Sequence, residues 1–452
     1  MKKLCVVFAV MFMFVVFFAA QAVAETYESD NNGNWDTLAT WDPEGKPGGE
    51  EDQADTAAIV DGHTVTVNST VPSASGATVT TVTITDGTLM VVENGSLASA
   101  ITIATNGVLQ IGDGGAAGIV TGAITAGGGE LIFDHTGPVD FTNAISGGNL
   151  SLVRKGVSSS TTTLSTGAKN FGSGTISVNS GTLSIAQEIT STGAKSVTGG
   201  TLEFVEGGLG GSGAVTVDGG TLKWAATNTT DGISSRLSVV SGTLDIASAG
   251  VTFAAVPAVT GTLTKAGVGD LTLNGTIPGN WTVNAGTLIL SENSNFSEAD
   301  KTLLINPGAA LEIVGDKMLT IGANAKLEIK KGGELVVGSD GAINLSALGS
   351  TVTLLSTSLD DFGGDAFDPD NPGRVFVNGG NDKGLKMTKA LYDEINTRDP
   401  ELLGFLVEDP EGIEIIDEPS PGRSSSGGCA ATGFAPFAVL ALLGMAALRR
   451  RA

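Results

Sequence analysis

The sequence predicts an all-β protein: a single-stranded right-handed parallel β-helix with an N-terminal cap and a small C-terminal appended region. Two observations favour this fold class. The motif Gly-Thr-Leu recurs at steps near twenty residues, which is typical of a solenoid. Apolar and polar residues alternate on both sides of each copy, which is the period of a β-strand.

The N-terminus, residues 1–24, has the pattern of a secretory signal peptide. Lys2 and Lys3 form a positive region, an apolar run covers residues 4–20, and small residues end at Ala24. This order predicts cleavage after Ala24 and export of the mature chain. A membrane anchor retained in the mature protein is the alternative, and the well-formed small-residue exit disfavours it.

Residues 25–75 are expected to cap the N-terminal end of the solenoid. An uncovered end would expose strand edges to pairing with other chains. Trp35 and Trp41 supply aromatic bulk for this cap. The segments 57–60 and 64–67 have the apolar alternation of its first strands.

Residues 76–350 are predicted to form the solenoid itself. Copies of the motif begin at Gly87, Gly181, Gly200, Gly220, Gly242, Gly261 and Gly286. From the second copy onward the steps are 19, 20, 22, 19 and 25 residues. A valine stands three residues before the glycine at Val178, Val197, Val217, Val239 and Val283. Each unit is therefore predicted to be a strand, a sharp turn in which the glycine can take positive φ, and a second strand.

Stacked units place like residues above one another at about 4.8 Å. One buried ladder is expected from Leu183, Leu202, Leu222, Leu244, Leu263 and Leu288. A neighbouring ladder is expected from Ile185, Phe204, Trp224, Ile246 and Leu290. The threonines expected to face outward are Thr182, Thr201, Thr221, Thr243, Thr262 and Thr287.

The same register places Glu203, Lys223 and Asp245 in one outward column. Acid, base and acid in succession are favourable neighbours on adjacent strands. At roughly 21 residues per coil, the solenoid would hold about 13 coils and extend on the order of 60 Å.

The segments 261–275 and 281–288 resemble the autotransporter-associated β-strand repeat of secreted passenger domains. The first reads Gly-Thr-Leu-Thr-Lys-Ala-Gly-Val-Gly-Asp-Leu-Thr-Leu-Asn-Gly, and the second ends in Gly-Thr-Leu. The resemblance is close over about thirty residues and looser over the rest of the body. It implies a parallel β-helix displayed at the cell surface.

After residue 350 the repeat fades. Residues 351–416 are expected to form a C-terminal cap or a small module, with one short helix within residues 382–398. Residues 417–428 are rich in proline, serine and glycine, which is typical of a linker.

The last segment, residues 429–452, has the pattern of a sorting signal. An apolar run, residues 430–448, is near the lower limit of about 17–25 residues for a membrane span. The residues that define the signal are Gly427, Gly428, Cys429, Arg449, Arg450 and Arg451. The final arginines would stay on the cytoplasmic side, with the rest of the chain outside. A plain C-terminal anchor is the alternative.

A glycine and cysteine motif, an apolar helix and an arginine cluster together resemble the bacterial CTERM sorting domains, most closely the Synergist-CTERM and GlyGly-CTERM types. The resemblance implies that a sorting protease cuts the tail near Cys429 and that the protein moves to the cell surface. The thiol of Cys429 offers a place for a lipid-type modification. Contact with the membrane would run through the tail before processing.

The chain is strongly acidic, with a formal net charge of −24. Five basic residues and no acidic ones lie in the two ends, so the body keeps 19 basic against 48 acidic residues, a charge of −29. Such a body should repel nucleic acid and anionic membranes. The two cysteines, Cys5 and Cys429, both lie in the ends, so no disulfide is expected within the mature body.

No catalytic constellation is predicted, although some parallel β-helices are polysaccharide lyases or hydrolases. His63, expected in a cap turn, and His135, expected in a loop, are far apart in the sequence. Glycosidase chemistry needs two carboxylates across a cleft. Glu203 and Asp245 more simply belong to the charged column. The remaining acidic cluster, more simply a solvated loop, comprises Asp360, Asp361 and Asp365.

No cofactor is predicted. Calcium is the ion to consider in an acidic exported repeat protein, but Val215 stands where the nonapeptide calcium repeat has aspartate. An EF-hand loop beginning at Asp368 would place Gly379 where a bidentate glutamate is required. Weak calcium binding at Asp365–Asp370 is the one hypothesis that remains.

These features favour an exported, cell-surface-anchored structural or adhesive protein. Its expected partners are the export machinery, a C-terminal sorting protease, and glycans or neighbouring surface proteins. The alternatives are a cell-surface polysaccharide lyase or glycoside hydrolase of the β-helix type, and a cargo domain with no binding role beyond its shape.

Overall fold

The computed structural model describes residues 25–49, 54–71, 78–247, 249–338, 341–345, 347–355, 374–376, 384–398 and 413–416. The chain divides into two units, Met1–Ile416 and Asp417–Ala452. Every described residue belongs to the first unit. The segments predicted to act as signal peptide, linker and sorting signal lie outside the described residues.

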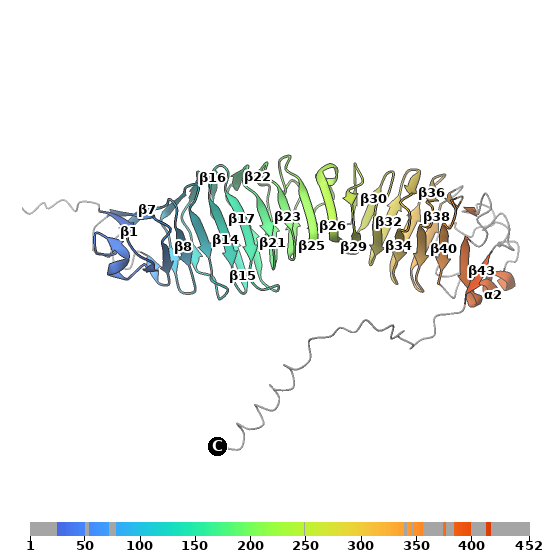
Figure 1. Cartoon of the computed structure of the whole chain (residues 1–452), viewed down its shortest axis with the longest axis horizontal. Helices are drawn as coiled ribbons and strands as arrows, with labels where there is room; N and C mark the ends of the chain where they lie inside the picture. The colour runs from blue at the N-terminus through green and yellow to red at the C-terminus, as the bar shows by residue number, and fades with distance from the viewer. Residues whose placement is uncertain are drawn as a thin grey trace, which may run out of the picture. The chain divides into compact units, whose positions relative to one another are not determined.

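The first unit is a parallel β-solenoid of about 13 turns, which confirms the predicted all-β β-helix (Figure 1). Successive coils pair strand on strand in parallel register. The one antiparallel pair among the described strands joins the first strand of the chain to a short cap strand. Each coil contributes three strands, and each strand belongs to a different face of the solenoid. The apolar side chains of all faces meet inside the stack.

The first face begins in the cap and carries the initial strand of each early coil. In spatial order its strands are β3 (Trp41–Asp42), β1 (Thr26–Ser29), β4 (Ala54–Ile59), β7 (Thr78–Ile84), β10 (Ala100–Ile103), β13 (Ile124–Ala126) and β16 (Ile145–Gly147). Two further strands follow in the next coils, β19 (Asn170–Gly172) and β22 (Thr190–Ser191).

The second face carries the middle strands. They are β2 (Gly33–Asn34), β5 (Thr64–Val67), β8 (Thr88–Val91), β11 (Val108–Ile111), β14 (Glu130–Asp134), β17 (Ser151–Lys155), β20 (Ile176–Val178) and β23 (Lys195–Val197). The face continues through the first halves of two long strands, β25 (Val215–Trp224) and β26 (Leu237–Ile246), to β28 (Ala258–Val259).

The third strands of the coils form two separate sheets. The short one holds β6 (Thr70–Val71), β9 (Ser96–Leu97) and β12 (Ile119–Val120). The long one, called here the third-face sheet, starts with β15 (Pro138–Phe141), β18 (Thr161–Leu164), β21 (Thr182–Ile185) and β24 (Thr201–Phe204). It continues through the second halves of β25 and β26 to β29 (Thr262–Ala266), β31 (Asn280–Val283), β34 (Thr302–Ile305), β37 (Lys326–Ile329), β40 (Thr351–Leu354), β42 (Leu385–Thr388) and β43 (Glu414–Ile416).

Two sheets appear only in the C-terminal coils. One contains β27 (Gly250–Thr252), β30 (Asp270–Leu273), β32 (Gly286–Leu290), β35 (Ala309–Ile313) and β38 (Glu334–Val337). The other contains β33 (Ser294–Phe296), β36 (Met318–Ile321), β39 (Ala342–Asn344) and β41 (Arg374–Phe376).

The predicted buried ladders are confirmed over four coils. Leu183, Leu202, Leu222 and Leu244 stand in register and are fully buried. The neighbouring ladder runs through Ile185, Phe204, Trp224 and Ile246. Each buried leucine contributes about 1.5–3 kcal/mol through the apolar area that it removes from water. The core is therefore a repeated aliphatic stack reinforced at Trp224, whose ring lies 5.0 Å from that of Phe204.

The predicted ladders are wrong beyond Ile246. Leu263 lies opposite Gly242, not Leu244. The strand is therefore displaced by two positions from the register that aligns the motif leucines, and both Leu263 and Lys265 still face inward. Leu288 and Leu290 belong to a different sheet, in β32, where they pair with Leu271, Leu311, Leu273 and Ile313.

The motif glycines are required for close stacking more than for positive φ. Gly181, Gly242 and Gly286 have positive φ, but the other motif glycines do not, so the predicted turn conformation holds only in part. A Cβ on Gly200 would lie 2.4 Å from the carbonyl oxygen of Gly181, and one on Gly220 would lie 2.5 Å from Val197 Cγ1. Only glycine lets the turns of neighbouring coils approach this closely.

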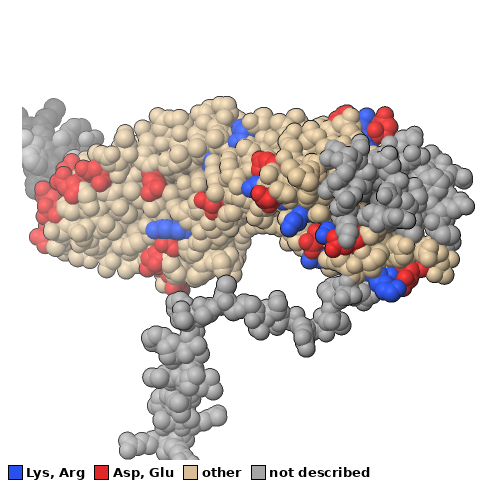
Figure 2. Space-filling view, turned by 45° about the vertical axis from the view of Figure 1, so that its right-hand side comes forward, with Lys and Arg blue, Asp and Glu red and all other residues tan. Residues whose placement is uncertain are grey.

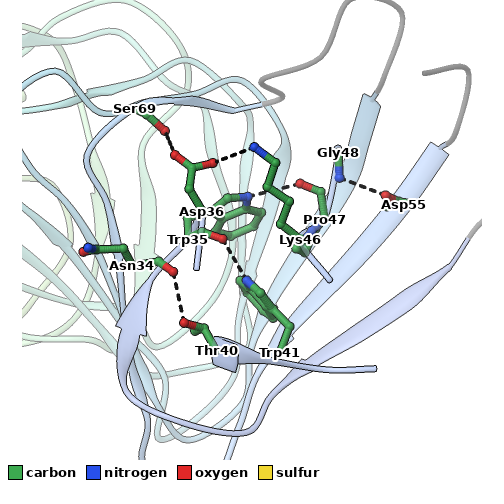
Figure 3. Close-up of polar contacts among 10 residues, drawn as sticks. All are labelled: Asn34, Trp35, Asp36, Thr40, Trp41, Lys46, Pro47, Gly48, Asp55 and Ser69. Atoms are coloured by element: carbon green, nitrogen blue, oxygen red, sulfur yellow. Dashed lines mark hydrogen bonds and ion pairs between the residues drawn. The ribbon is translucent and has the colours of Figure 1, made fainter. Parts of the chain in front are cut away.

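The N-terminal cap is organised around two buried indoles (Figure 3). The rings of Trp35 and Trp41 pack edge to face with centroids 4.9 Å apart. Trp35 donates to the carbonyl of Pro47 at 3.2 Å, and Trp41 donates to the carbonyl of Trp35 at 2.9 Å. These bonds satisfy both buried N–H groups. Strands β1 and β2 already stack in parallel on β4 and β5, so parallel stacking begins within residues 26–34.

The third-face sheet also extends past residue 350 through β40, β42 and β43. Helix α2 (Lys389–Arg398) follows β42 and confirms the short helix expected in this region. Its Leu391 and Ile395 are buried at i, i+4 spacing, so one helix face packs against the solenoid. The described residues also include two 3₁₀ turns, η1 (Leu38–Thr40) and η2 (Ser234–Arg236).

Candidate functional site: a threonine ladder and its groove

Seven threonines form one outward column on consecutive coils of the third-face sheet. Each is the register partner of the next, with no coil skipped. This column, the threonine ladder, consists of Thr161, Thr182, Thr201, Thr221, Thr243, Thr264 and Thr282. It crosses the register change unbroken, because a displacement of two positions places Thr264 rather than Thr262 beside Thr243.

The hydroxyl groups of the ladder have no partner within the described part of the chain. All seven threonines are half-buried, and none of their hydroxyls bonds to another described residue. On the first face, by contrast, Thr125 and Ser146 hydrogen-bond to each other at 3.3 Å. A β-branched side chain is stiff at χ1, so the ladder offers donors and acceptors in fixed places at about 4.8 Å intervals.

A mixed column runs beside the ladder, two residues further along each strand. Its members are Asp140, Thr163, Ser184, Glu203, Lys223 and Asp245. The predicted succession of Glu203, Lys223 and Asp245 is therefore confirmed, and Lys223 Nζ lies 3.3 Å from Glu203 Oε1. The strip bordering the ladder carries three acids and one base, so it has a net negative charge.

A groove of about 350 Å³ lies at the N-terminal end of the ladder. It occupies the place where the third strands divide, since β12 pairs with β9 and β15 pairs with β18 but β12 and β15 do not pair. Ile119, Val139 and Phe141 give it apolar walls, and Asp140 adds a carboxylate. Ile119 is 59% exposed, so this wall is open to a ligand.

The groove and the ladder share strands. Pro138, at the groove, is the register partner of Thr161, and Asp140 is the partner of Thr163. The two features therefore form one continuous strip along the third face. Charged side chains are sparse over most of the face seen in Figure 2, where acidic residues gather near the N-terminal end.

A second hollow, of about 230 Å³, lies among the loops around residues 207–211 and 228–236. Its charged groups are largely occupied. The carboxylate of Asp231 accepts from the backbone N–H of Ser234 at 2.7 Å, and Arg236 donates to the carbonyl of Gly213 at 2.6 Å. These contacts shape the loops and leave little for a ligand.

Buried basic side chains lie inside the solenoid and bind main-chain carbonyls. Four of them are Arg154, Lys169, Lys195 and Lys265. Lys265 takes the core position opposite Leu244, as a result of the register change. Its Nζ donates to the carbonyls of Ala285 at 2.6 Å and Gly267 at 2.8 Å, and also to Gly269. Burial lowers the pKa of Lys265 to about 8, against the opposing influence of Asp270 and Asp245.

The two histidines occupy structural positions. His63 lies in the turn between β4 and β5, where Nδ1 is 2.8 Å from the carbonyl oxygen of Ser29. His135 follows β14 in a connection, as expected, but its side chain is fully buried. Its Nε2 lies 2.7 Å from Thr162 Oγ1. Burial, reinforced by the nearby Arg154 charge, lowers the pKa of His135.

The carboxylates considered for glycosidase chemistry are not arranged across a cleft. Glu203 and Asp245 lie in one column on either side of Lys223. Neither borders either of the two hollows described above. Among the residues that the structure describes, no group of three or more His, Cys, Asp or Glu side chains could hold a metal ion.

The other candidate positions lie outside the described residues. They are Ala24, Asp360, Asp361, Asp365–Asp370, Gly427, Gly428, Cys429, Arg449, Arg450 and Arg451. Within the described part of the chain, no helix has both the length and the hydropathy needed to cross a bilayer.

Sequence reasoning found four members of the threonine ladder and missed Thr161, Thr264 and Thr282. Thr262 and Thr287 also face outward but belong to other columns. The one irregularity in the sequence at this point is the distance from valine to leucine, which is one residue shorter at Val259, and it does not give the shift of two positions that places Thr264 in the ladder. No family model matches the chain, and searches of curated proteins and of solved structures found no significant match.

Proposed function

We propose that the protein is an exported, cell-surface-anchored β-helix with a structural or adhesive role. The threonine ladder is the observation that carries this proposal. It gives a β-solenoid of about 13 turns a row of unengaged hydroxyls on seven successive coils. A rigid, extended surface of this kind suits contact with glycans or with neighbouring surface proteins.

Export and anchoring rest on the two ends of the sequence. Residues 1–24 would direct export, and Gly427, Gly428, Cys429 and the terminal arginines would direct sorting by a protease. Intact mass spectrometry of protein from washed native cells tests both steps. We expect a mature chain that starts at Glu25 and ends near Cys429 with added mass.

A Cys429→Ala variant is the matched control for sorting. It should stay unprocessed and fail to reach the surface. A mature chain that still carries the tail through Arg451 would contradict sorting, and the protein would then be an anchored exported solenoid.

The proposed role is non-enzymatic. Two observations support this proposal. Lys223 stands between Glu203 and Asp245 in the column, and neither acid borders either of the two hollows. The alternative is a cell-surface polysaccharide lyase or glycoside hydrolase. Release of reducing or unsaturated ends from a polysaccharide by the purified chain would favour that alternative.

A further inference from the structure

We infer that the groove and the threonine ladder together bind a neutral linear polysaccharide along the third face, an inference that rests on the proposed adhesive role. The groove would hold one sugar unit, and the ladder would hold the units that follow. Pro138 and Asp140 connect the two parts, because they line the groove and stand in register with the first ladder strand.

The geometry favours a linear polymer. The continuous row of hydroxyls is the ladder, whereas the adjacent column carries hydroxyls only at Thr163 and Ser184 and is charged at its other four positions. A planar ligand would therefore meet charges at its border. A chain that follows the column meets one donor and acceptor per coil, and the stiff side chains lose little freedom when it binds.

The charge around the ladder favours a neutral polymer. Three acids and one base border the column, and the chain as a whole carries −24. Nucleic acids and polyuronates are anionic and would be repelled. Neutral sugars present hydroxyl groups that both donate and accept, which complements a row of threonine hydroxyls.

The groove supplies apolar contacts, which a row of hydroxyl groups lacks. Ile119 and Val139 can cover the apolar face of a sugar ring, and Asp140 can accept from its hydroxyls. Ligand sites typically combine apolar walls with a few placed polar groups. A volume of about 350 Å³ is in the range expected for such sites.

Binding of the full chain to polysaccharides tests this inference. The probes are insoluble cellulose in a pull-down and soluble galactomannan in affinity gel electrophoresis, with anionic polygalacturonate as the charged comparison. We expect retention by at least one neutral polymer and none by polygalacturonate. The double variant Thr201→Val/Thr221→Val removes two ladder hydroxyls at nearly constant shape and should weaken binding about tenfold or more.

Two further variants separate the site from the rest of the surface. Ile119→Ser removes an exposed groove wall and should also weaken binding about tenfold. Thr83→Val/Thr102→Val changes two half-buried threonines on the first face and should bind like the parent. Unchanged melting temperatures in all three variants would show that the fold is intact.

Several results would overturn the inference: no retention by either neutral polymer, equal binding of the ladder variant and the parent, or stronger binding to polygalacturonate. A change in oligomeric state in the ladder variant, without a change in polysaccharide binding, would assign the face to a second copy of the chain.

Antibody labelling of washed cells tests the proposed surface location separately from polysaccharide binding. If the parent protein is on the surface but binds no polysaccharide, only the inference of polysaccharide binding is refuted. If the protein binds polysaccharide but is absent from the surface, only the proposed cell-surface role is refuted.

Discussion

The third-face sheet contains two regions that use the same Gly-Thr-Leu motif in different ways. From β21 to β26, each leucine follows its valine at the fifth position, and the leucines stack in one ladder. At β29, Leu263 follows Val259 at the fourth position and lies opposite Gly242, two positions from the motif register. The difference teaches that the pairing between coils, not the motif alone, sets which residues stack.

The second region keeps the outward surface and changes the interior. Thr264 replaces the motif threonine in the ladder, so the hydroxyl row remains continuous. The interior changes at Lys265, which occupies a core position where its ammonium group must be solvated by main-chain carbonyls. A buried ammonium is tolerated only with such partners.

The largest expected effect tests whether both regions are packed equally well. Trp224 lies between Phe204 and Phe253, and Trp281 stands between Leu263 and Leu303. Both indoles are fully buried. Trp224→Ala and Trp281→Ala should each lower the free energy of unfolding by about 3–5 kcal/mol in urea denaturation. A loss below about 1 kcal/mol at Trp281 alone would contradict the register assigned to the second region.

A smaller effect tests the close approach of the turns. Gly220→Ala should destabilise the first region by about 1–3 kcal/mol, since the new Cβ would meet Val197 Cγ1 at 2.5 Å. Gly148→Ala is the matched control, because its Cβ would meet nothing within 4 Å. The account requires clearly different melting temperatures for these two variants, and equal values would argue against tight stacking.

The pH dependence of stability distinguishes the regions through Lys265. Burial lowers its pKa to about 8 from the ordinary value of 10.5. The unfolded chain therefore holds this proton to higher pH, and the free energy of unfolding should rise between about pH 8 and pH 10.5. Urea denaturation at about pH 7.5 and pH 10 measures that rise.

Lys265→Met should show a smaller rise than the parent, by on the order of 1–3 kcal/mol. Lys169 and Lys195, whose pKa values burial also lowers to about 8, remain in both proteins and cancel in the comparison. The same rise in parent and variant would exclude Lys265 as the titrating group.

The smallest effect concerns the charged column. The ion pair of Lys223 with Glu203 is partly exposed, so a double-mutant cycle with Lys223→Met and Glu203→Gln should give a coupling below about 1 kcal/mol. The coupling should shrink further in high salt. A coupling that is large and insensitive to salt would mean that the column is buried by a partner.

The fold was predictable because its signals are local and repeated. Alternation around Val178 and Leu183 fixes a strand on each side of a turn, and repetition at nearly constant steps fixes the stacking. The same reasoning failed at Leu263, because the motif was aligned by its glycine, whereas the pairing is displaced by two positions from that alignment. A shift of one would exchange the inner and outer sets, but a shift of two keeps them, so the alternation of apolar residues does not reveal it.

The candidate site was predictable only in part. The outward direction of Thr182, Thr201 and Thr243 follows from alternation. The groove does not, because it depends on β12 and β15 failing to pair, which is a contact between coils. The buried lysines could not be predicted from the sequence either. Alternation places apolar residues inside the solenoid, and it cannot show which carbonyls would accept hydrogen bonds from Lys265.

Cysteine cross-linking tests the central claim, the continuity of the threonine ladder across the register change, most directly. The only native cysteines, Cys5 and Cys429, would be replaced by serine. Register partners on neighbouring strands have Cα atoms about 5 Å apart, within disulfide range, whereas a residue two positions further along lies about 8 Å away. We predict that Thr243→Cys/Thr264→Cys forms a disulfide under mild oxidation and that Thr243→Cys/Thr262→Cys does not. Preferential formation of the second disulfide would show that the motif keeps its register, and the ladder would then continue through Thr262 instead of Thr264.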